Sequence, residues 1–366
     1  MGYSADLSTS FGRIPGVHYF LRPQRESSED NSLPEISALA KKRVPYLDGW
    51  RGMAILLVLT AHFYGIVYNL GYLGVDTFFV LSGLLMGRIL FVDQVPLRTF
   101  YRNRIARIFP VYYLYLAVIS FMMLHHMVKL HASDIGYAAI FMRTYLGDYS
   151  IWNDDAIQLS HTWSLNIEEH CYLLLSIISL ITLRKNESAA RLFVTAAALL
   201  CIGFLGYYKT HPPASPSPFF LRTECAGFSI FASAAIYLWR RKLPFTVPSY
   251  VPLAATALGF AIGAFSTHGF GKFIYPSLFL AIAVNTLDAA PAWFLSILSN
   301  PVLMWFGICS YSIYMWQQIF FSMVMESAPS IRVLGVCIAV AVGAFSFYFY
   351  EQPMRKRLHA PKRQQQ

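Results

Sequence analysis

Long apolar stretches alternate with short polar segments along the chain after residue 45. Ten of these stretches come close to, or exceed, the length of about 20 residues that a helix needs to cross a bilayer. The hydrocarbon core offers no partner for backbone polar groups, which favours helices. We therefore predict an all-α membrane protein with about ten transmembrane helices. The predicted spans are 50–68, 72–92, 108–128, 162–183, 192–208, 222–239, 251–268, 271–287, 301–325 and 331–350.

An eleventh apolar stretch, 135–146, is shorter than the others and contains Arg143. If it crossed the membrane, every later loop would change sides. The basic cluster at 240–242 would then face outward, against the preference of lysine and arginine for cytoplasmic loops. Ten spans place most of the 29 lysine and arginine residues on the cytoplasmic side. We therefore expect 135–146 to be a short re-entrant or interfacial segment, and both termini to be cytoplasmic.

The polar segments divide the chain into three parts. Residues 1–45 lack the early apolar core of a signal peptide and are predicted to be a cytoplasmic tail. Residues 46–354 form the membrane domain, and residues 355–366 form a basic cytoplasmic tail. Within the membrane domain, 148–161 and 211–218 are expected to be external loops; the second contains four prolines, which a helix cannot accommodate.

Composition agrees with a polytopic membrane protein. Of the 366 residues, 56% are hydrophobic and only 13% are charged, about half the charged share of a soluble domain. This excludes a cytosolic enzyme, a disordered hub and a secreted disulfide scaffold. We attribute the net charge of +10 to cytoplasmic loops and expect no nucleic-acid partner. The five cysteines lie in apolar stretches without a CxxC pair, so we expect no metal site.

Ionisable side chains inside apolar spans are costly, so each suggests a function. Arg51 and His62 lie eleven residues apart in the first span, which places them on one helical face about 16 Å apart along the axis. We expect both to face a common interior channel, with His62 positioned to accept a proton near neutral pH. The alternative is a polar histidine that serves helix packing.

The second span contains Asp76, Ser82 and Gly83. Together with His62 they place an acid, a hydroxyl and a base on neighbouring helices. A serine beside a histidine can be a nucleophile, but no nucleophile-elbow motif is present. We favour Ser82 as a hydrogen-bond donor to a substrate carbonyl; the alternative for the Ser-Gly pair is close helix packing.

A predicted cytoplasmic loop, 98–107, contains four arginines that follow the second span. Plain positive-inside charge is one explanation. Arginine at all four positions also suits phosphate, which a guanidinium binds in a bidentate manner. Arg104 and Arg107 would share a face if the loop were helical. We therefore predict a site for a phosphate-bearing cofactor here.

Polar residues also open the fourth span. Glu168 and Glu169 lie about two turns inside it, beyond the reach of the helix dipole that would otherwise explain them. We expect them to orient an imidazole or to bind sugar hydroxyls. The preceding His161, Trp163 and Ser164 are expected to contact substrate.

Six sequence blocks in order resemble the acyltransferase-3 family of integral-membrane O-acyltransferases. The blocks are YLDGWRGMAILLVLTAHF, GVDTFFVLSG, FYRNRIARIFPVYYL, HTWSLNIEEHCYLL, SYSIYMWQ and YEQPMRKR. The resemblance implies transfer of an acyl group, usually acetyl from acetyl-CoA, to a hydroxyl of a carbohydrate or glycoconjugate. It implies that Arg51 and His62 are essential, with His62 as the catalytic base. Residues of the other functional blocks match Ser82, Gly83, Arg104, Arg107 and Glu168.

The chain departs from the family pattern in two blocks. Gln317 stands where members often have the histidine of YLWH, so a histidine at that position is no part of this mechanism. The family EEQFY block reads EEHCY, at 168–172. The chain ends soon after the last span, so we expect the stand-alone form without a fused esterase-like domain.

These observations favour an enzyme of a bacterial inner membrane. Arg104 and Arg107 would hold the phosphates of acyl-CoA, and Glu168 or Glu169 would hold the imidazole of His62. Direct transfer and an acyl-histidine intermediate both remain open, as does a homo-oligomer. The competing hypothesis is a non-catalytic exporter or flippase of a glycolipid.

Overall fold

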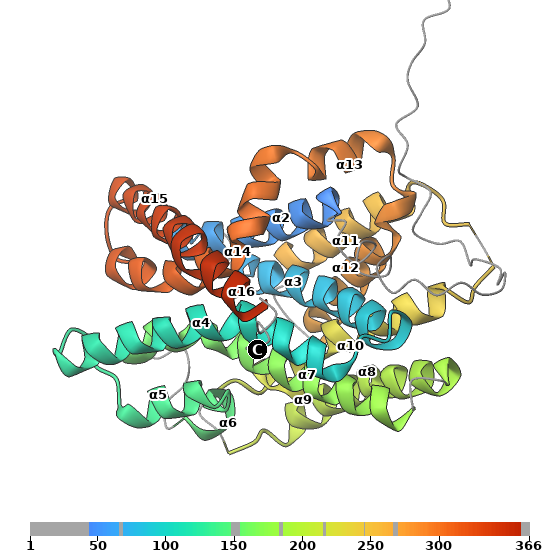
Figure 1. Cartoon of the computed structure of the whole chain (residues 1–366), viewed down its shortest axis with the longest axis horizontal. Helices are drawn as coiled ribbons and strands as arrows, with labels where there is room; N and C mark the ends of the chain where they lie inside the picture. Colours follow the sequence, from blue (N-terminus) through green and yellow to red (C-terminus); the bar gives the residue numbers. More distant parts are fainter. Residues whose placement is uncertain are drawn as a thin grey trace, which may run out of the picture. The chain divides into compact units, whose positions relative to one another are not determined.

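The structure is a computed structural model that describes residues 44–65, 69–147, 154–182, 186–214, 217–244, 246–265 and 270–359. These ranges contain helices and connecting segments but no strand. The described residues lie within one compact unit (Figure 1). The predicted tail, 1–45, lies outside the described residues except for its last two. The all-α fold class is confirmed for the part of the chain that the structure describes.

Each predicted span corresponds to one long helix or to consecutive helices. They are α2 (Pro45–Tyr64), α3 (Leu70–Met86) with η1 (Gly87–Val92), α4 (Leu97–Leu124), α7 (Trp163–Ile181), α8 (Glu187–Thr210), α9 (Thr223–Ala226) with α10 (Phe228–Arg240), α11 (Val251–Phe265), α12 (Tyr275–Thr286), α14 (Pro301–Val324), and α15 (Pro329–Ser346) with η6 (Phe347–Glu351) and α16 (Gln352–His359). The apolar pattern therefore located the long helices, although several of their ends differ.

Short helices connect the long ones. Outside 135–146 they are η2 (Asp154–Thr162), η3 (Phe219–Leu221), η4 (Phe270–Phe273), η5 (Leu287–Ala289) and α13 (Ala292–Leu298). The predicted external loop 148–161 therefore ends in a 3-10 helix, while 148–153 lie outside the described residues. Residues 215–216 of the proline-rich loop also lie outside the described residues.

Length and hydropathy identify five helices within the described residues that could cross a membrane. They are Leu70–Val92, Leu97–Leu124, Ile157–Ile181, Glu187–Thr210 and Pro329–Leu358. The pair Gly271–Ala289 and Ala292–Leu298, bent by 113°, gives a sixth if it counts as one broken span. These helices and their composition are those of a multi-pass membrane protein. The count of about ten spans stays a prediction.

The stretch 135–146 forms two short helices, α5 (Ala132–Ala139) and α6 (Arg143–Leu146). Neither is long enough to span a bilayer. Arg143 of α6 is buried within the protein: its Nη1 donates to the carbonyl oxygen of Leu159 at 3.3 Å, and its Nε lies 3.8 Å from Oδ1 of Asp134. Burial lowers the pKa of this guanidinium, and Asp134 opposes that shift.

A segment predicted to be a loop, and part of the predicted basic tail, are helical. Residues 98–107, expected to be a loop, form the first turns of α4, which begins directly after Pro96. Proline favours a helix start, and arginine is a good helix former, so the charged segment continues the helix beyond the apolar span. Likewise, residues 355–359 of the predicted basic tail belong to α16; residues 360–366 lie outside the described residues.

Close packing of α2 against α14 sets the frame of the site. A Cβ on Gly52 would overlap the carbonyl oxygen of Leu303, and a Cβ on Gly307 would overlap that of Asp48. Glycine at these positions lets the two backbones touch, as small residues do between membrane helices. Figure 1 shows α2 in blue beside α14 in orange. Both helices are therefore partly shielded by protein, which allows them to contain polar side chains.

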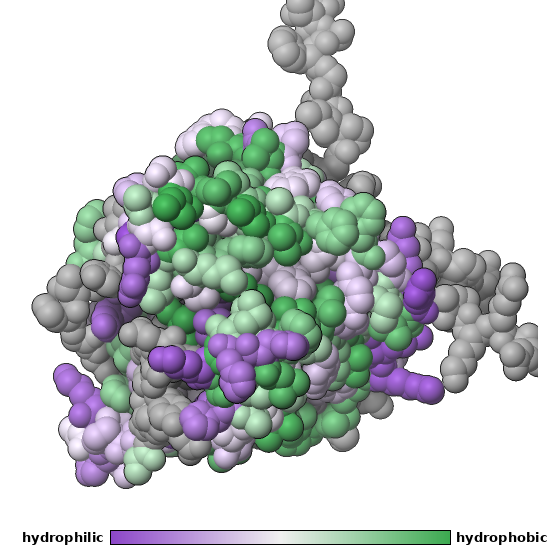
Figure 2. All heavy atoms as spheres, turned by 90° about the vertical axis from the view of Figure 1, so that its left-hand side faces the viewer, coloured by the Kyte–Doolittle hydropathy of each residue, from purple (hydrophilic) through white to green (hydrophobic). Residues whose placement is uncertain are grey.

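Much of the remaining surface is apolar. Figure 2 shows one face on which hydrophobic side chains cover wide areas between hydrophilic patches. Exposed leucine and phenylalanine side chains lie on α8, at Leu199, Leu200 and Phe204, and on α15 and η6, at Phe345 and Phe349. An exposed apolar surface of this extent fits contact with lipid.

Candidate active site

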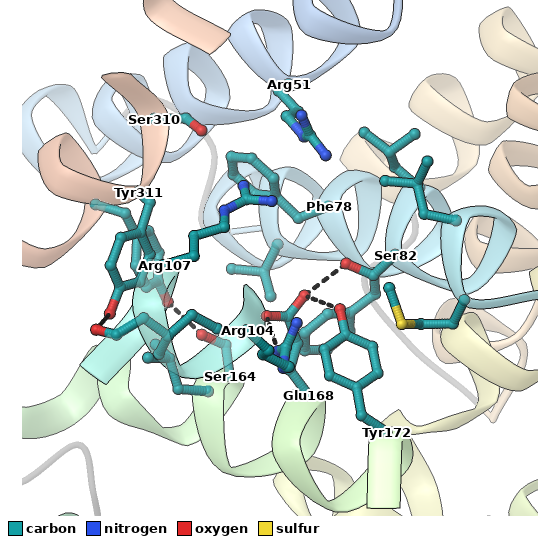
Figure 3. Close-up of a pocket in the computed structure, with 18 residues that line it drawn as sticks. Arg51, Phe78, Ser82, Arg104, Arg107, Ser164, Glu168, Tyr172, Ser310 and Tyr311 are labelled. Atoms are coloured by element: carbon teal, nitrogen blue, oxygen red, sulfur yellow. Dashed lines mark hydrogen bonds and ion pairs between the residues drawn. The ribbon is translucent and has the colours of Figure 1, made fainter. Parts of the chain in front are cut away.

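Two adjoining cavities lie within the helical unit. The first, of about 110 Å³, is lined by residues of α2, α3, α4, α7 and α14 (Figure 3). The second, of about 680 Å³, is lined mainly by residues of α2, α3, η2, η4 and α14. Val75 of α3 and Tyr314 of α14 line both cavities. These two side chains therefore form the partition between them.

The predicted site residues divide between the two cavities. The first is lined by Arg51, Ser82, Arg104, Arg107, Ser164 and Glu168. The second is lined by His62, Asp76, His161 and Trp163. Gly83 and Glu169 belong to neither lining. The expected single channel with Arg51 and His62 is thus replaced by two cavities, because side chains of α3 and α14 close the space between the two ends of α2.

Arg104 is engaged by the protein itself. Its Nε donates to Oε1 of Glu169 at 3.0 Å, and its Nη2 donates to Oε2 of Glu168 at 3.4 Å. Its guanidinium carbon lies 3.4 Å from the centroid of the Tyr172 ring. The side chain is 10% exposed. Two carboxylates and a ring therefore already contact this guanidinium and would compete with a phosphate for it.

The Glu168 carboxylate also binds two hydroxyl groups. Ser82 Oγ donates to Oε1 of Glu168 at 2.6 Å, and the Tyr172 hydroxyl donates to the same oxygen at 3.1 Å. Figure 3 shows these groups together on one side of the first cavity. The Ser82 hydroxyl proton is directed at Glu168 in this structure, and the donation of Ser82 to a substrate carbonyl stays a prediction.

Arg51 and Arg107 face the opposite side of the first cavity. Nη1 of Arg51 lies 3.3 Å from Oδ1 of Asp48, one turn earlier on α2. Arg107 has no ion pair within the described ranges, and its guanidinium lies near Phe78 and Arg51 in Figure 3. Two guanidinium groups line this part of the cavity, where Asp48 pairs with Arg51 and Glu351 interacts electrostatically with Arg107. An anion is the ligand that such a site favours.

His62 lies in the second cavity and contacts α14. Its Nδ1 is 2.9 Å from Oε1 of Gln317, and its ring stacks on Phe321, with centroids 5.0 Å apart. Glu168 and Glu169 contact Arg104, so the structure does not bring them to the imidazole of His62. Gln317, the residue that departs from the family pattern, therefore contacts His62, which the resemblance identifies as the catalytic base.

Asp76 and His161 also line the second cavity. Oδ1 and Oδ2 of Asp76 accept hydrogen bonds from Ser229 and Ser277, the latter at 2.7 Å. Asp76 thus joins α3 to α10 and α12. Neither ring nitrogen of His161 has a hydrogen-bond partner among the described residues, and the ring is buried between Tyr115 and Tyr314.

Aromatic rings form one wall of the second cavity. Tyr72 and Trp163 stack with their centroids 5.9 Å apart and an angle of 5° between the rings. Phe220 and Phe273 stack at 4.8 Å, with Lys272 above them. Aromatic faces with scattered polar groups can bind the apolar faces of sugar rings while hydroxyls find polar partners.

Gly83 has a packing role in the structure. A Cβ there would overlap the carbonyl oxygen of Ile230 on α10. The close approach of α3 and α10 explains this glycine, which was expected to contact substrate, and it supports the alternative that the Ser-Gly pair serves helix packing.

Sequence reasoning did not select three residues that the geometry places at the site: Gln317, Tyr314 and Tyr172. Each lies in a quoted motif, but a motif does not say which of its residues face a cavity. One signal was available, because Gln317 and Gln318 form a polar pair within an apolar span, where polar groups are costly.

Comparison with protein families matches residues 44–351 to a family described as "Acyltransferase domain". The chain belongs to this acyltransferase family. The match includes both cavities and all the site residues named above. Within the described ranges, no group of three His, Cys, Asp or Glu side chains is arranged to hold a metal ion.

Two proteins similar to this chain have names that describe peptidoglycan O-acetyltransferases. One is "Peptidoglycan O-acetyltransferase OatA" of Listeria monocytogenes, 27% identical over 87% of this chain and 56% of the relative. Another is "Putative peptidoglycan O-acetyltransferase YrhL" of Bacillus subtilis, 27% identical over 85% of this chain and 55% of the relative. The chain thus spans about half the length of these relatives. No solved structure matches it.

Proposed function

We propose that this acyltransferase is a membrane O-acetyltransferase. It moves an acetyl group from cytoplasmic acetyl-CoA to a hydroxyl of a carbohydrate or glycoconjugate acceptor on the other side of the membrane. The observation that supports this most is the position of His62, in a cavity that shares Val75 and Tyr314 with a second cavity lined by Arg51 and Arg107. The names of the relatives suggest peptidoglycan as the acceptor class.

The donor phosphates bind at Arg51 and Arg107. These two guanidinium groups face the first cavity, whereas Arg104 is held by Glu168 and Glu169. A guanidinium binds phosphate through paired hydrogen bonds. Both arginines lie toward the ends of their helices that the charge distribution places in the cytoplasm. The pantetheine arm then extends toward the Val75–Tyr314 partition.

The acceptor lies in the second cavity, beside His62. The imidazole removes the hydroxyl proton, the hydroxyl oxygen attacks the thioester carbonyl carbon, and the carbon–sulfur bond breaks. The proton on His62 passes to the departing CoA thiolate, so the free thiol and the acetyl ester are the products. A positioned base of this kind contributes about 100- to 10,000-fold to a rate.

The reaction requires passage of the acetyl group across the partition. Tyr314 is held there by a hydrogen bond with Ser164 Oγ at 2.8 Å and by donation to the carbonyl oxygen of His161 at 2.9 Å. Movement of this ring, or of Val75, opens the way from the donor cavity to His62. We place the protein in a bacterial inner membrane with both termini in the cytoplasm, as the positive-inside distribution indicates.

The test uses the full chain purified into nanodiscs. CoA thiol release from acetyl-CoA is measured with and without a soluble peptidoglycan oligosaccharide, and the acetylated product is identified by mass spectrometry. His62→Ala should lower transfer by about 100-fold or more. His125→Ala is the control, since this histidine is exposed at the end of α4. Normal transfer by His62→Ala, or no thiol release by the unaltered protein, would overturn the proposal; an exporter would release no thiol.

A further inference from the structure

Two consecutive glutamines of α14 link His62 to η2 through buried hydrogen bonds. Gln317 and Gln318 are 0% and 1% exposed. Oε1 of Gln317 is 2.9 Å from Nδ1 of His62, and Nε2 of Gln317 donates to Oε1 of Gln318 at 3.0 Å. Nε2 of Gln318 donates to the carbonyl oxygen of Ile157 at 2.9 Å and to Ser160 Oγ at 2.8 Å. Every link joins a donor to an acceptor, and the bonds from Gln318 to Gln317 and to Ser160 are buried.

The orientation of both glutamine amides in this chain of hydrogen bonds is fixed by the Ile157 carbonyl. The carbonyl oxygen of Ile157 can only accept, so the Gln318 amide must turn its NH₂ group toward it. Ser160 Oγ donates to the same carbonyl at 2.8 Å, which leaves its lone pairs for Gln318. Oε1 of Gln318 therefore faces Gln317 and accepts from it. By the same reasoning, Gln317 presents its oxygen to His62.

We infer that Gln317 is a positioning residue that holds His62 in the tautomer with a proton on Nδ1, so that Nε2 is the nitrogen that removes the acceptor proton. This inference rests on the proposed role of His62 as a base. An oxygen acceptor at Nδ1 requires a proton there, and a neutral imidazole then has its lone pair on Nε2. The stacking on Phe321, one turn later on α14, fixes the ring plane as well.

The space in front of Nε2 agrees with this assignment. Gly71 of α3 lies nearby, and even a Cβ added there would be 3.9 Å from Nε2. Both Gly71 and His62 line the second cavity, so Nε2 is open toward the proposed acceptor. The charged or titratable groups that line this cavity around His62 are Tyr72, Asp76, His161, Lys272, Tyr314, Glu326 and Arg332.

Three substitutions at Gln317 separate positioning from packing. Gln317→Glu keeps an acceptor of the same shape, so transfer continues. Because the new carboxylate favours the imidazolium form of His62, the base becomes protonated sooner as the pH is lowered. The acidic limb of the pH–rate profile therefore moves to a higher pH than in the unaltered protein. Gln317→Met keeps the size but removes the acceptor, and should lower kcat by about 10- to 100-fold, the usual effect of losing a partner that orients a functional histidine. Gln317→Lys offers only a donor to Nδ1, favours the opposite tautomer, and should be at least as impaired as Gln317→Met.

Matched controls come from the same helix. Ser322→Ala removes a hydroxyl that donates to the Ile319 carbonyl within α14 and should leave kcat unchanged. Gln318→Met removes the group that fixes the direction of the Gln317 amide and should cause a smaller loss than Gln317→Met. The KM for acetyl-CoA and the melting temperature are measured for every variant, so that a folding defect is recognised.

The outcomes are distinct. The inference is supported if Gln317→Glu retains transfer with a displaced acidic limb of its pH–rate profile while Gln317→Met loses kcat at unchanged donor KM. It is overturned if Gln317→Met and Gln317→Glu keep the rate and pH profile of the unaltered protein while His62→Ala is inactive. If His62→Ala is itself active, the proposed function fails, whatever the Gln317 variants do.

Discussion

Arg104 lies flat on the ring of Tyr172, with its guanidinium carbon 3.4 Å from the ring centroid, while its edge binds Glu168 and Glu169. A cation over an aromatic face with two carboxylates at its edge is neutralised on all sides. The Arg104 guanidinium joins α4 to α7. The Glu168 carboxylate that it contacts also accepts a hydrogen bond from Ser82 and so joins α7 to α3. Arg104 is therefore the centre of a contact among three helices.

Substitution of Arg104 should affect the stability of the protein more than its binding of the acetyl donor. Arg104→Gln leaves two partly buried carboxylates without their cation, so the loss of stability should be smaller than the cost of breaking a fully buried pair, which is about 3 kcal/mol. We expect a lower melting temperature in detergent. The double variant with Glu169→Gln should recover part of that loss, because one of the unpaired carboxylates is removed. Unchanged melting of Arg104→Gln would contradict this role.

Arg107 should behave in the opposite way. Its guanidinium faces the first cavity without an ion pair in the described part of the chain. Arg107→Ala should raise the KM for acetyl-CoA about tenfold, the cost of a lost charged hydrogen bond of about 1.5 kcal/mol, while the melting temperature changes little. The effect should shrink as ionic strength rises, because salt screens the attraction.

The matched control for Arg107 is Arg102→Ala. Arg102 lies on the same helix but is exposed and outside the cavity lining. Its loss should leave the KM unchanged. Equal effects of the two substitutions would show that general positive charge, not a phosphate site, attracts the donor.

The sequence predicted the helices better than it predicted their ends. Apolar length marks where lipid or protein surrounds a helix, and each of the ten stretches is largely helical over its described residues. It does not mark where hydrogen bonding stops, which is why α4 extends over the four arginines from Leu97 and why α16 includes part of the basic tail. The bend between α12 and α13 falls at η5 and Pro291, a break that proline favours but that the apolar pattern does not mark.

The candidate site was predictable as a set of residues but not as an arrangement. Helical spacing correctly put Arg51 and His62 on one helix, but it could not show that Tyr314, far away in sequence, divides the space between them. The same limit applies to Glu168. Its charge marked it as functional, whereas its partners, Ser82 and Arg104, come from two other helices.

Tyr314 should limit access of water from the second cavity to the donor. Tyr314→Leu removes the ring and its bonds to Ser164 and the His161 carbonyl. We expect hydrolysis of acetyl-CoA without acceptor to rise about 3- to 10-fold, because closed sites suppress such side reactions. Thiol release without acceptor is the measurement. Tyr311→Phe is the control: it lines only the first cavity and donates to the Ile108 carbonyl. A rise in both variants, or in neither, would argue against a partition at Tyr314.

Asp76 should support the second cavity without taking part in proton transfer. Both of its oxygens already accept hydrogen bonds, from Ser229 and Ser277. Asp76→Asn keeps the shape but turns one acceptor into a donor, which costs about 1–3 kcal/mol for an unsatisfied buried group. The expected result is a lower melting temperature, with most of the acetyl transfer per folded molecule retained.

Ser277→Ala provides the matched control for Asp76, because it removes one of the same hydrogen bonds from the side of α12. We expect a similar but smaller decrease in melting temperature and the same retained transfer. A proton-transfer role for Asp76 would give a different pattern. Asp76→Asn would then lose transfer by about 100-fold or more, while Ser277→Ala would stay active. Turnover per folded molecule, measured with acetyl-CoA and oligosaccharide saturating, decides between a carboxylate that holds three helices together and one that moves a proton.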